Sequence, residues 1–87
     1  MASYELVVRR SVAKDLRDLP NEDVARILER IHALREDPRP AGCEKLSGLE
    51  RYRIRLGSYR IIYEIEDRIL GVCVVKVGHR RNVYPSR

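Results

Sequence analysis

Long apolar segments are missing from this 87-residue chain, and cysteine and histidine are scarce. No run approaches the roughly 18 consecutive apolar residues of a membrane-spanning helix, and the first residues lack the apolar block of a signal peptide. We therefore expect a cytoplasmic protein. The only thiols are Cys43 and Cys73 and the only imidazoles are His32 and His79, without the spacing of a metal site. We expect no metal or other cofactor, and cysteines that only fill space.

Charged residues make up 36% of the chain, and the net charge is +5. With 44% apolar residues this composition fits a folded protein, and the length predicts one domain over residues 1–87. The basic excess is uneven, because residues 1–44 hold 8 Lys or Arg against 9 Asp or Glu, whereas residues 45–87 hold 10 against 4. This asymmetry indicates a localised site for an anionic partner.

Hydrophobic spacing and helix-breaking residues predict the order of elements. A strand-like run comes first, followed by two segments with apolar residues at helical spacing and then three more strand-like runs. Prolines end both helical segments. This order predicts an α+β fold with a twisted, mainly antiparallel four-stranded sheet and both helices packed on one face. The expected elements are strand 4–9, helices 11–19 and 21–37, a connection over 38–50, and strands 51–56, 59–66 and 69–77.

Arginine recurs at every second position from Arg51 to Arg55, so the strand 51–56 carries three arginines on one face and apolar residues on the other. Gly57-Ser58 suits a two-residue hairpin with glycine in the first turn position. Pairing back from that turn sets Arg55 opposite Arg60, and like charges in this position destabilise a sheet. A ligand that neutralises the repulsion accounts for it, and a polyphosphate backbone is the obvious candidate.

The last strand is expected to end beside this turn, which brings the segment 79–81 toward Arg55 and Arg60. The alternative to an anion-binding site is an ordinary solvated surface, on which the arginines pair with nearby glutamates as surface charges often do. The pattern alone leaves both interpretations open. The glutamates concerned are Glu50, Glu64 and Glu66. The residues expected on the helix side of the last strand are Leu70, Val72 and Val74.

Two segments resemble the RelE/ParE superfamily of toxin–antitoxin toxins, and its RelE branch more closely: Tyr-Arg-Ile-Arg-Leu-Gly-Ser-Tyr-Arg-Ile-Ile-Tyr from Tyr52 to Tyr63, and Val-Gly-His-Arg-Arg-Asn-Val-Tyr from Val77 to Tyr84. The similarity covers nearly the whole chain, and the tail motif Gly-His-Arg-x-x-Val-Tyr is its most specific part. The resemblance implies a single RelE-like toxin domain that enters the ribosomal A site and cuts mRNA there without a metal. It also implies a cognate RelB-like antitoxin that holds the toxin inactive in a hetero-oligomer.

Carried over position by position, the resemblance assigns roles to individual residues. It implies that Arg60 holds phosphate, that Arg80 assists the leaving group and that Tyr84 orients a base or stacks on it. Arg53 and Arg55 stand where RelE-like enzymes commonly have basic residues. The expected catalytic residues are Arg55, Arg60, Arg80 and Tyr84. The residues expected to bind RNA are Arg53, Lys45, Arg51, His79 and Arg81.

The chemistry of such a site leaves its general base open. Attack by a ribose 2′-hydroxyl needs that proton removed and the charge on the phosphorane stabilised. Arginine serves the second task, because its planar guanidinium binds two phosphate oxygens. It cannot serve the first, because it does not deprotonate in proteins. His79, Tyr84 or a ribosomal group can be the base, or catalysis can rest on electrostatics and positioning alone.

Other readings stay open as well. The competing class is a ParE-like protein that blocks DNA gyrase by binding, and a third is a catalytically inactive basic module. An antitoxin can contact the protein through an amphipathic segment or neutralise its arginines with acidic residues. Among the remaining candidates, His32 is expected to be structural or solvated. The tyrosines expected to pack in the core are Tyr52, Tyr59 and Tyr63.

Overall fold

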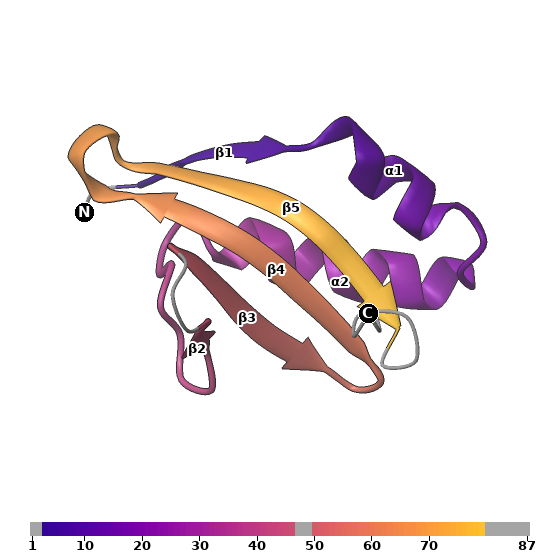
Figure 1. The fold of residues 1–87 in the computed structure, drawn as a ribbon. Coiled ribbons are helices and arrows are strands. Elements are labelled where there is room, and N and C mark those ends of the chain that lie inside the picture. The colour runs from indigo at the N-terminus through magenta and orange to yellow at the C-terminus, as the bar shows by residue number, and fades with distance from the viewer. Residues whose placement is uncertain (1–2, 47–49, 80–87) are drawn as a thin grey trace.

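The computed structural model describes residues 3–46 and 50–79, and in it two N-terminal helices pack on one face of a five-stranded sheet (Figure 1). The strand order is β1-β5-β4-β3-β2, with β1 parallel to β5 and the other pairs antiparallel. The predicted α+β class and helix placement are confirmed. The elements are β1 (Glu5–Val8), α1 (Arg10–Arg17), α2 (Asn21–Ala33), β2 (Glu44–Lys45), β3 (Arg51–Leu56), β4 (Tyr59–Glu66), a 3₁₀ turn (Asp67–Ile69) and β5 (Gly71–His79).

Three details of the predicted elements were wrong. The sheet has a fifth strand, β2, inside the expected connection over 38–50, where it pairs with β3. Helix α2 ends at Ala33 and not at residue 37. After Ala33 the backbone forms hydrogen bonds between residues three apart, as in a 3₁₀ turn, for example from Leu34 N–H to Ile31 O. Leu70 is 41% exposed and left-handed (φ 51°), since it closes the β4–β5 turn instead of beginning a core-facing strand. No helix in the described ranges has the length and apolarity needed to span a membrane.

The β3–β4 hairpin has the predicted bounds and register. Gly57 has a φ of +60°, which glycine tolerates without strain and which the first position of this turn requires. Tyr52 therefore pairs with Tyr63, and Arg55 with Arg60. Alternation along both strands then gives the sheet one apolar and one basic face.

The core lies between the helices and the apolar face of the sheet. Tyr63 is fully buried, stacks on Tyr52 at a centroid distance of 5.8 Å, and donates a hydrogen bond from its hydroxyl to Pro38 O at 2.7 Å. Tyr59 packs against the core edge and donates to Asp23 of α2 at 2.6 Å. The packing role predicted for these three tyrosines is confirmed. The buried core residues are Val12, Ile27, Ile31, Leu34, Tyr52, Ile54, Ile61, Tyr63, Ile65, Val72, Val74 and Val77.

A β-bulge in β5 shifts its alternation. Tyr63 pairs with Val74 whereas Ile62 pairs with Lys76, so Val75 is the extra residue. Val74 and Val77, three positions apart, consequently both reach the core. Beyond the bulge every side chain of β5 lies on the face opposite to the one that simple alternation predicts.

A second cluster, which we call the arginine latch, joins the connection after α2 to the β4–β5 turn. Arg39 donates to both carboxylate oxygens of Asp67, at 3.2 and 2.9 Å, and its guanidinium lies 5.2 Å from the centre of the Tyr52 ring. The Tyr4 hydroxyl donates to the same carboxylate at 2.8 Å. These hydrogen bonds, that of Arg39 first, lower the pKa of Asp67 below its ordinary value. The latch thus connects four segments through one carboxylate and one guanidinium.

Candidate functional site

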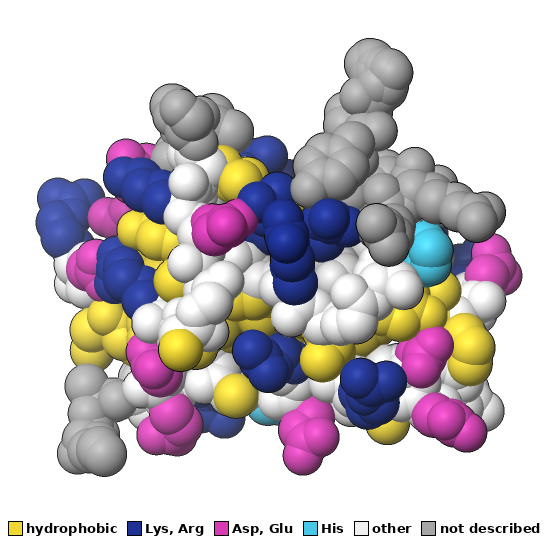
Figure 2. Space-filling model, turned by 90° about the horizontal axis from the view of Figure 1, so that it is seen from below, with side chains coloured by type: hydrophobic (Ala, Val, Ile, Leu, Met, Phe, Trp, Pro, Cys, Tyr) yellow, Lys and Arg dark blue, Asp and Glu magenta, His cyan; other side chains and the backbone are white. Residues whose placement is uncertain are grey.

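Four arginines share the sheet face that points away from the helices, and we call this surface the arginine face. It consists of Arg51, Arg53 and Arg55 of β3 and Arg60 of β4. Their cross-strand partners and alternation with buried residues put them on one side. Seen from below, basic side chains gather in the middle of this region beside an acidic one (Figure 2). The sequence-based prediction of a cationic stripe is therefore confirmed for residues that the structure describes.

Arg55 and Arg60 lie directly opposite each other across β3 and β4. Their Cβ atoms are about 4.5–5.5 Å apart in such a pair, which is within reach of one phosphate group for two long side chains. Arg60 is opposite Gly78 on its other side, so its direct partner in β5 contributes no side chain there. Arg55 is exposed and forms no ion pair with any carboxylate of the described residues. The pair is accordingly suited to bind an anion.

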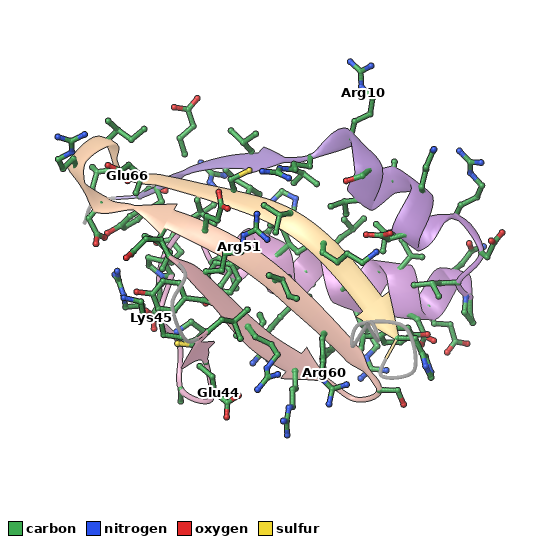
Figure 3. The ribbon with its side chains drawn as sticks, viewed as in Figure 1. Arg10, Glu44, Lys45, Arg51, Arg60 and Glu66 are labelled. Carbon is green, nitrogen blue, oxygen red and sulfur yellow. The ribbon has the colours of Figure 1, made fainter. Side chains whose placement is uncertain are left out.

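Glu44 is the acidic residue of the arginine face, and the sequence analysis missed it. It is paired directly with Arg53 across β2 and β3, and its carboxylate forms an ion pair and a hydrogen bond with the Arg53 guanidinium. That hydrogen bond, followed by the charges of Arg53, Arg55 and Arg60, lowers the pKa of Glu44 below its ordinary value. In Figure 3 Glu44 and Arg60 both project toward the lower side of the sheet. A two-residue strand has no periodicity, so no sequence signal placed Glu44 there.

The alternative of a surface neutralised by glutamates applies to only part of this face. Arg51 forms an ion pair with Glu64 at 2.8 Å. Glu66 instead pairs with Arg68 at 3.2 Å, and Glu50 with Lys45 at 3.7 Å. Within the described part of the chain, these three glutamates thus form their ion pairs with Lys45, Arg51 and Arg68, and not with Arg55 or Arg60.

Two of the predicted RNA-binding residues lie on the other side of the sheet. His79 pairs with Tyr59, and the two rings make an edge-to-face contact at a centroid distance of 5.5 Å. Because Tyr59 packs against the core, His79 is on the helix side and not beside Arg60. Lys45 pairs with Tyr52, another core residue, so its side chain also leaves its strand toward the helix side. The end of β5 does lie beside the turn, as predicted, but the bulge in β5 reverses its alternation and so puts His79 on the helix side.

The end of β5 is attached to α1 by one carboxylate. Asp15 accepts a hydrogen bond from Val77 N at 3.0 Å and pairs with Lys76 at 3.3 Å. Beside it is a pocket of about 260 Å³ on the helix side, lined by Lys14, Asp18 and His79 among others. This attachment positions the residue from which the tail motif continues. Arg80, Arg81 and Tyr84, which were predicted to act with the arginine face, lie outside the described residues.

No three His, Cys, Asp or Glu side chains within residues 3–46 and 50–79 come together as a group that could hold a metal ion. Of the two described histidines, His32 is exposed on α2 and His79 packs on Tyr59.

The sequence profile of a family described as "ParE toxin of type II toxin-antitoxin system, parDE" matches residues 6–84. Over 89 residues the chain is 30% identical to "Putative toxin RelE1" of Methanocaldococcus jannaschii, covering 95% of this chain and 97% of that protein. Among solved structures, the fold is similar to a chain of the archaeal RelE–RelB complex from Pyrococcus horikoshii OT3. The TM-score is 0.81 and the sequence identity 30%, and the match covers 93% of this chain and 99% of that one. A chain of the toxin–antitoxin complex RelBE2 from Mycobacterium tuberculosis matches with a TM-score of 0.81 and 26% sequence identity. That match covers 94% of this chain and 97% of the other.

These similarities extend over the elements that form the fold and the arginine face. The profile and the full-length relative span both helices and the strands that carry the arginine face. The solved structures share the arrangement of the helices and the sheet over more than nine-tenths of the chain. The chain therefore belongs to the RelE/ParE superfamily and is a toxin of a type II toxin–antitoxin system.

Proposed function

We propose that this toxin is a ribosome-dependent endoribonuclease that cuts mRNA in the ribosomal A site and so inhibits translation. The observation that carries the proposal is the direct pairing of Arg55 with Arg60 on the sheet face that points away from the helices, with Arg53 beside them. Relatives named RelE at 30% identity support the same branch of the superfamily. A repulsive pair kept on a surface is best explained by an anion that binds there during function.

The reaction that fits this face is attack of a ribose 2′-hydroxyl on the adjacent phosphate. Arg55 and Arg60 would bind the non-bridging oxygens and stabilise the negative charge that grows on them in the transition state. A guanidinium supplies this stabilisation as a permanent hydrogen-bond donor, without giving up a proton. The ribosome would supply the alignment of the RNA strand, which converts a flexible linkage into a near-attack geometry. Arg80 and Tyr84 keep their predicted roles, at the leaving group and at a base.

Primer extension on translating ribosomes tests the proposal. The wild-type protein should produce cuts within A-site codons, and Arg60→Ala should lower the cleavage rate by about 10²–10³-fold, the usual effect of removing one transition-state donor. Arg10→Ala is the matched control, because it removes the same charge from the start of α1, on the opposite side of the molecule (Figure 3). Absence of wild-type cleavage would reject the proposal, as would equal losses in the two variants.

The second candidate is inhibition of DNA gyrase by binding, without RNA cleavage. The family profile supports it, because the description of that profile names the ParE toxin. Under this alternative the toxin should arrest supercoiling by purified gyrase and leave mRNA intact on ribosomes. The same preparation can be assayed in both reactions, so that one result excludes the other.

A RelB-like antitoxin is the partner we propose. The toxin chains from Pyrococcus horikoshii and Mycobacterium tuberculosis were crystallised in toxin–antitoxin complexes. An acidic segment laid over the arginine face would replace the phosphate groups of RNA. Co-expression of this chain with the product of a neighbouring small acidic reading frame should yield a stable complex that no longer cuts mRNA.

A further inference from the structure

Strand β1 is one edge of the sheet that the described residues form, and half of its backbone groups point away from the sheet (Figure 1). Glu5 N donates to Leu70 O at 2.7 Å and Arg9 N to Val74 O at 3.0 Å, so the odd-numbered residues of this segment bond to β5. In a parallel ladder the intervening residues direct their N–H and C=O groups to the other side. These outward groups can pair with a further strand. They belong to Leu6 and Val8.

Exposed apolar side chains also gather at this edge. Val7 is 54% exposed and Val8 41% exposed, although both are in a strand. The turn that is bonded to the start of β1 adds Ile69 and Leu70, which are 72% and 41% exposed. Burial of such side chains favours association with another molecule.

Two opposite charges flank the apolar residues of the edge. Glu5 and Arg9 are exposed, and neither forms an ion pair with any other described residue. Arg9 is extended (φ −62°, ψ 147°), so the alternation of β1 continues through it and puts both charges on the same face as Val7. Like charges at a sheet edge repel a second copy, whereas this arrangement offers each charge its opposite.

Only one antiparallel register of β1 on a second β1 uses all of these features. The outward backbone groups must face each other, which allows Leu6 to pair with Leu6 or Val8 of the second copy, or Val8 with Val8. The pairing of Leu6 with Val8 sets Val7 opposite Val7 and Glu5 opposite Arg9, twice by symmetry. The other two registers place each charge opposite an apolar residue or beyond the edge.

The ends of the segment limit this pairing to residues 5–9. At one end the Tyr4 N–H already donates to Arg35 O at 2.8 Å. At the other end α1 begins at Arg10. The five residues between them read acidic, three apolar and basic, a sequence that is complementary to itself when one copy runs antiparallel to the other.

We infer that β1 is a self-association edge, which pairs antiparallel with β1 of a second copy of this chain in the register that sets Glu5 opposite Arg9. The twofold axis then passes through the Val7 pair, perpendicular to a continuous sheet made by both copies. Both arginine faces lie on the same side of that sheet and are not part of the paired edge. The inference does not rest on the proposed ribonuclease function, because it concerns a different surface.

Sedimentation equilibrium of the purified full chain over a wide range of concentration tests the edge. The wild-type protein should form dimers, and Glu5→Arg should weaken the dimer by about tenfold or more, because both cross-strand ion pairs become repulsive. Arg9→Glu should have the same effect for the same reason. Glu29→Arg is the matched control, since it makes the same charge change at an exposed position of α2 and should dimerise as wild type does. Far-ultraviolet circular dichroism checks that each variant is folded.

Mixing the two edge variants tests the register itself. A Glu5→Arg chain carries two basic flanks and an Arg9→Glu chain two acidic flanks, so a pair made of one of each restores both attractions. The mixture should therefore contain heterodimers at concentrations at which each variant alone is monomeric. The double variant Glu5→Arg/Arg9→Glu, which exchanges the charges, should recover the wild-type dimer.

Three outcomes would overturn the inference. The first is a wild-type chain that remains monomeric, including a monomer whose binding of an antitoxin is weakened by Glu5→Arg, because the edge would then belong to that partner. The second is a dimer that persists unchanged in both single variants, which would place the contact elsewhere. The third is a mixture of the two variants that stays monomeric while both are folded. Loss of mRNA cleavage would bear on the proposed function alone.

Discussion

At one end of β4, Arg39 binds both oxygens of Asp67 and lies over the Tyr52 ring, whereas at the other end Arg60 stands directly opposite a second arginine. In the latch, the ion pair, the hydrogen bonds and the ring contact of Arg39 all favour the folded state, so this guanidinium stabilises the fold. On the arginine face the pairing of Arg55 with Arg60 opposes folding. Arg39 thus holds segments together, whereas the Arg55–Arg60 pair would gain stability from a bound anion, although both are in the same small protein.

The largest expected effect comes from reversing one charge of the repulsive pair. Arg55→Glu would place a carboxylate opposite Arg60 and create a favourable cross-strand pair, which should raise the free energy of unfolding by about 0.5 kcal/mol. It should also abolish phosphate binding at this point and lower ribosomal cleavage by at least about 10²-fold. Urea unfolding and primer extension on the same variant check the two effects. A less stable protein, or one that still cleaves, would contradict the separation of stability from function.

A substitution in the latch should lower the free energy of unfolding and leave RNA cleavage unchanged. Arg39→Ala removes the ion pair with Asp67 and the contact with Tyr52, and because these groups are partly exposed the expected loss is about 1 kcal/mol of unfolding free energy. Cleavage by the folded protein should equal that of wild type, since Arg39 is not on the arginine face. Arg17→Ala, an exposed arginine at the end of α1, is the control for removing one charge. If Arg39→Ala cut RNA as poorly as Arg60→Ala, the two regions would not be independent.

The smallest effect is a dependence of stability on acid pH. The pKa of Asp67 is lowered in the folded protein by its hydrogen bonds with Arg39 and Tyr4. Its stabilising contribution is therefore complete above the unfolded value of about 3.9 and is lost as the pH falls through the lower folded value. The stability difference between wild type and Arg39→Ala should shrink when urea unfolding is repeated below pH 4. A difference that stays constant down to pH 2 would show that the carboxylate contributes nothing.

Much of the fold could be read from local patterns. Alternation in the segment 51–56, the Gly57-Ser58 turn and the following apolar run together determine the hairpin, because turn length sets the register. Helical spacing of apolar residues before Pro20 and Pro38 places both helices. The predictions that failed concern segments without a periodic pattern. A two-residue strand such as β2 exists only through its pairing with β3, and Leu70 took a left-handed turn conformation that its side chain does not encode.

The sequence by itself determined the α+β class, the β3–β4 register and the presence of Arg53, Arg55 and Arg60 on one face, because each follows from local alternation and one turn. Only the tertiary structure decided which acidic or basic groups join them. The bulge in β5 turned His79 toward the helices, and the pairing of β2 with β3 brought Glu44 beside Arg53. Both outcomes depend on contacts between segments far apart in the chain. A periodic pattern within one segment carries no information about such contacts.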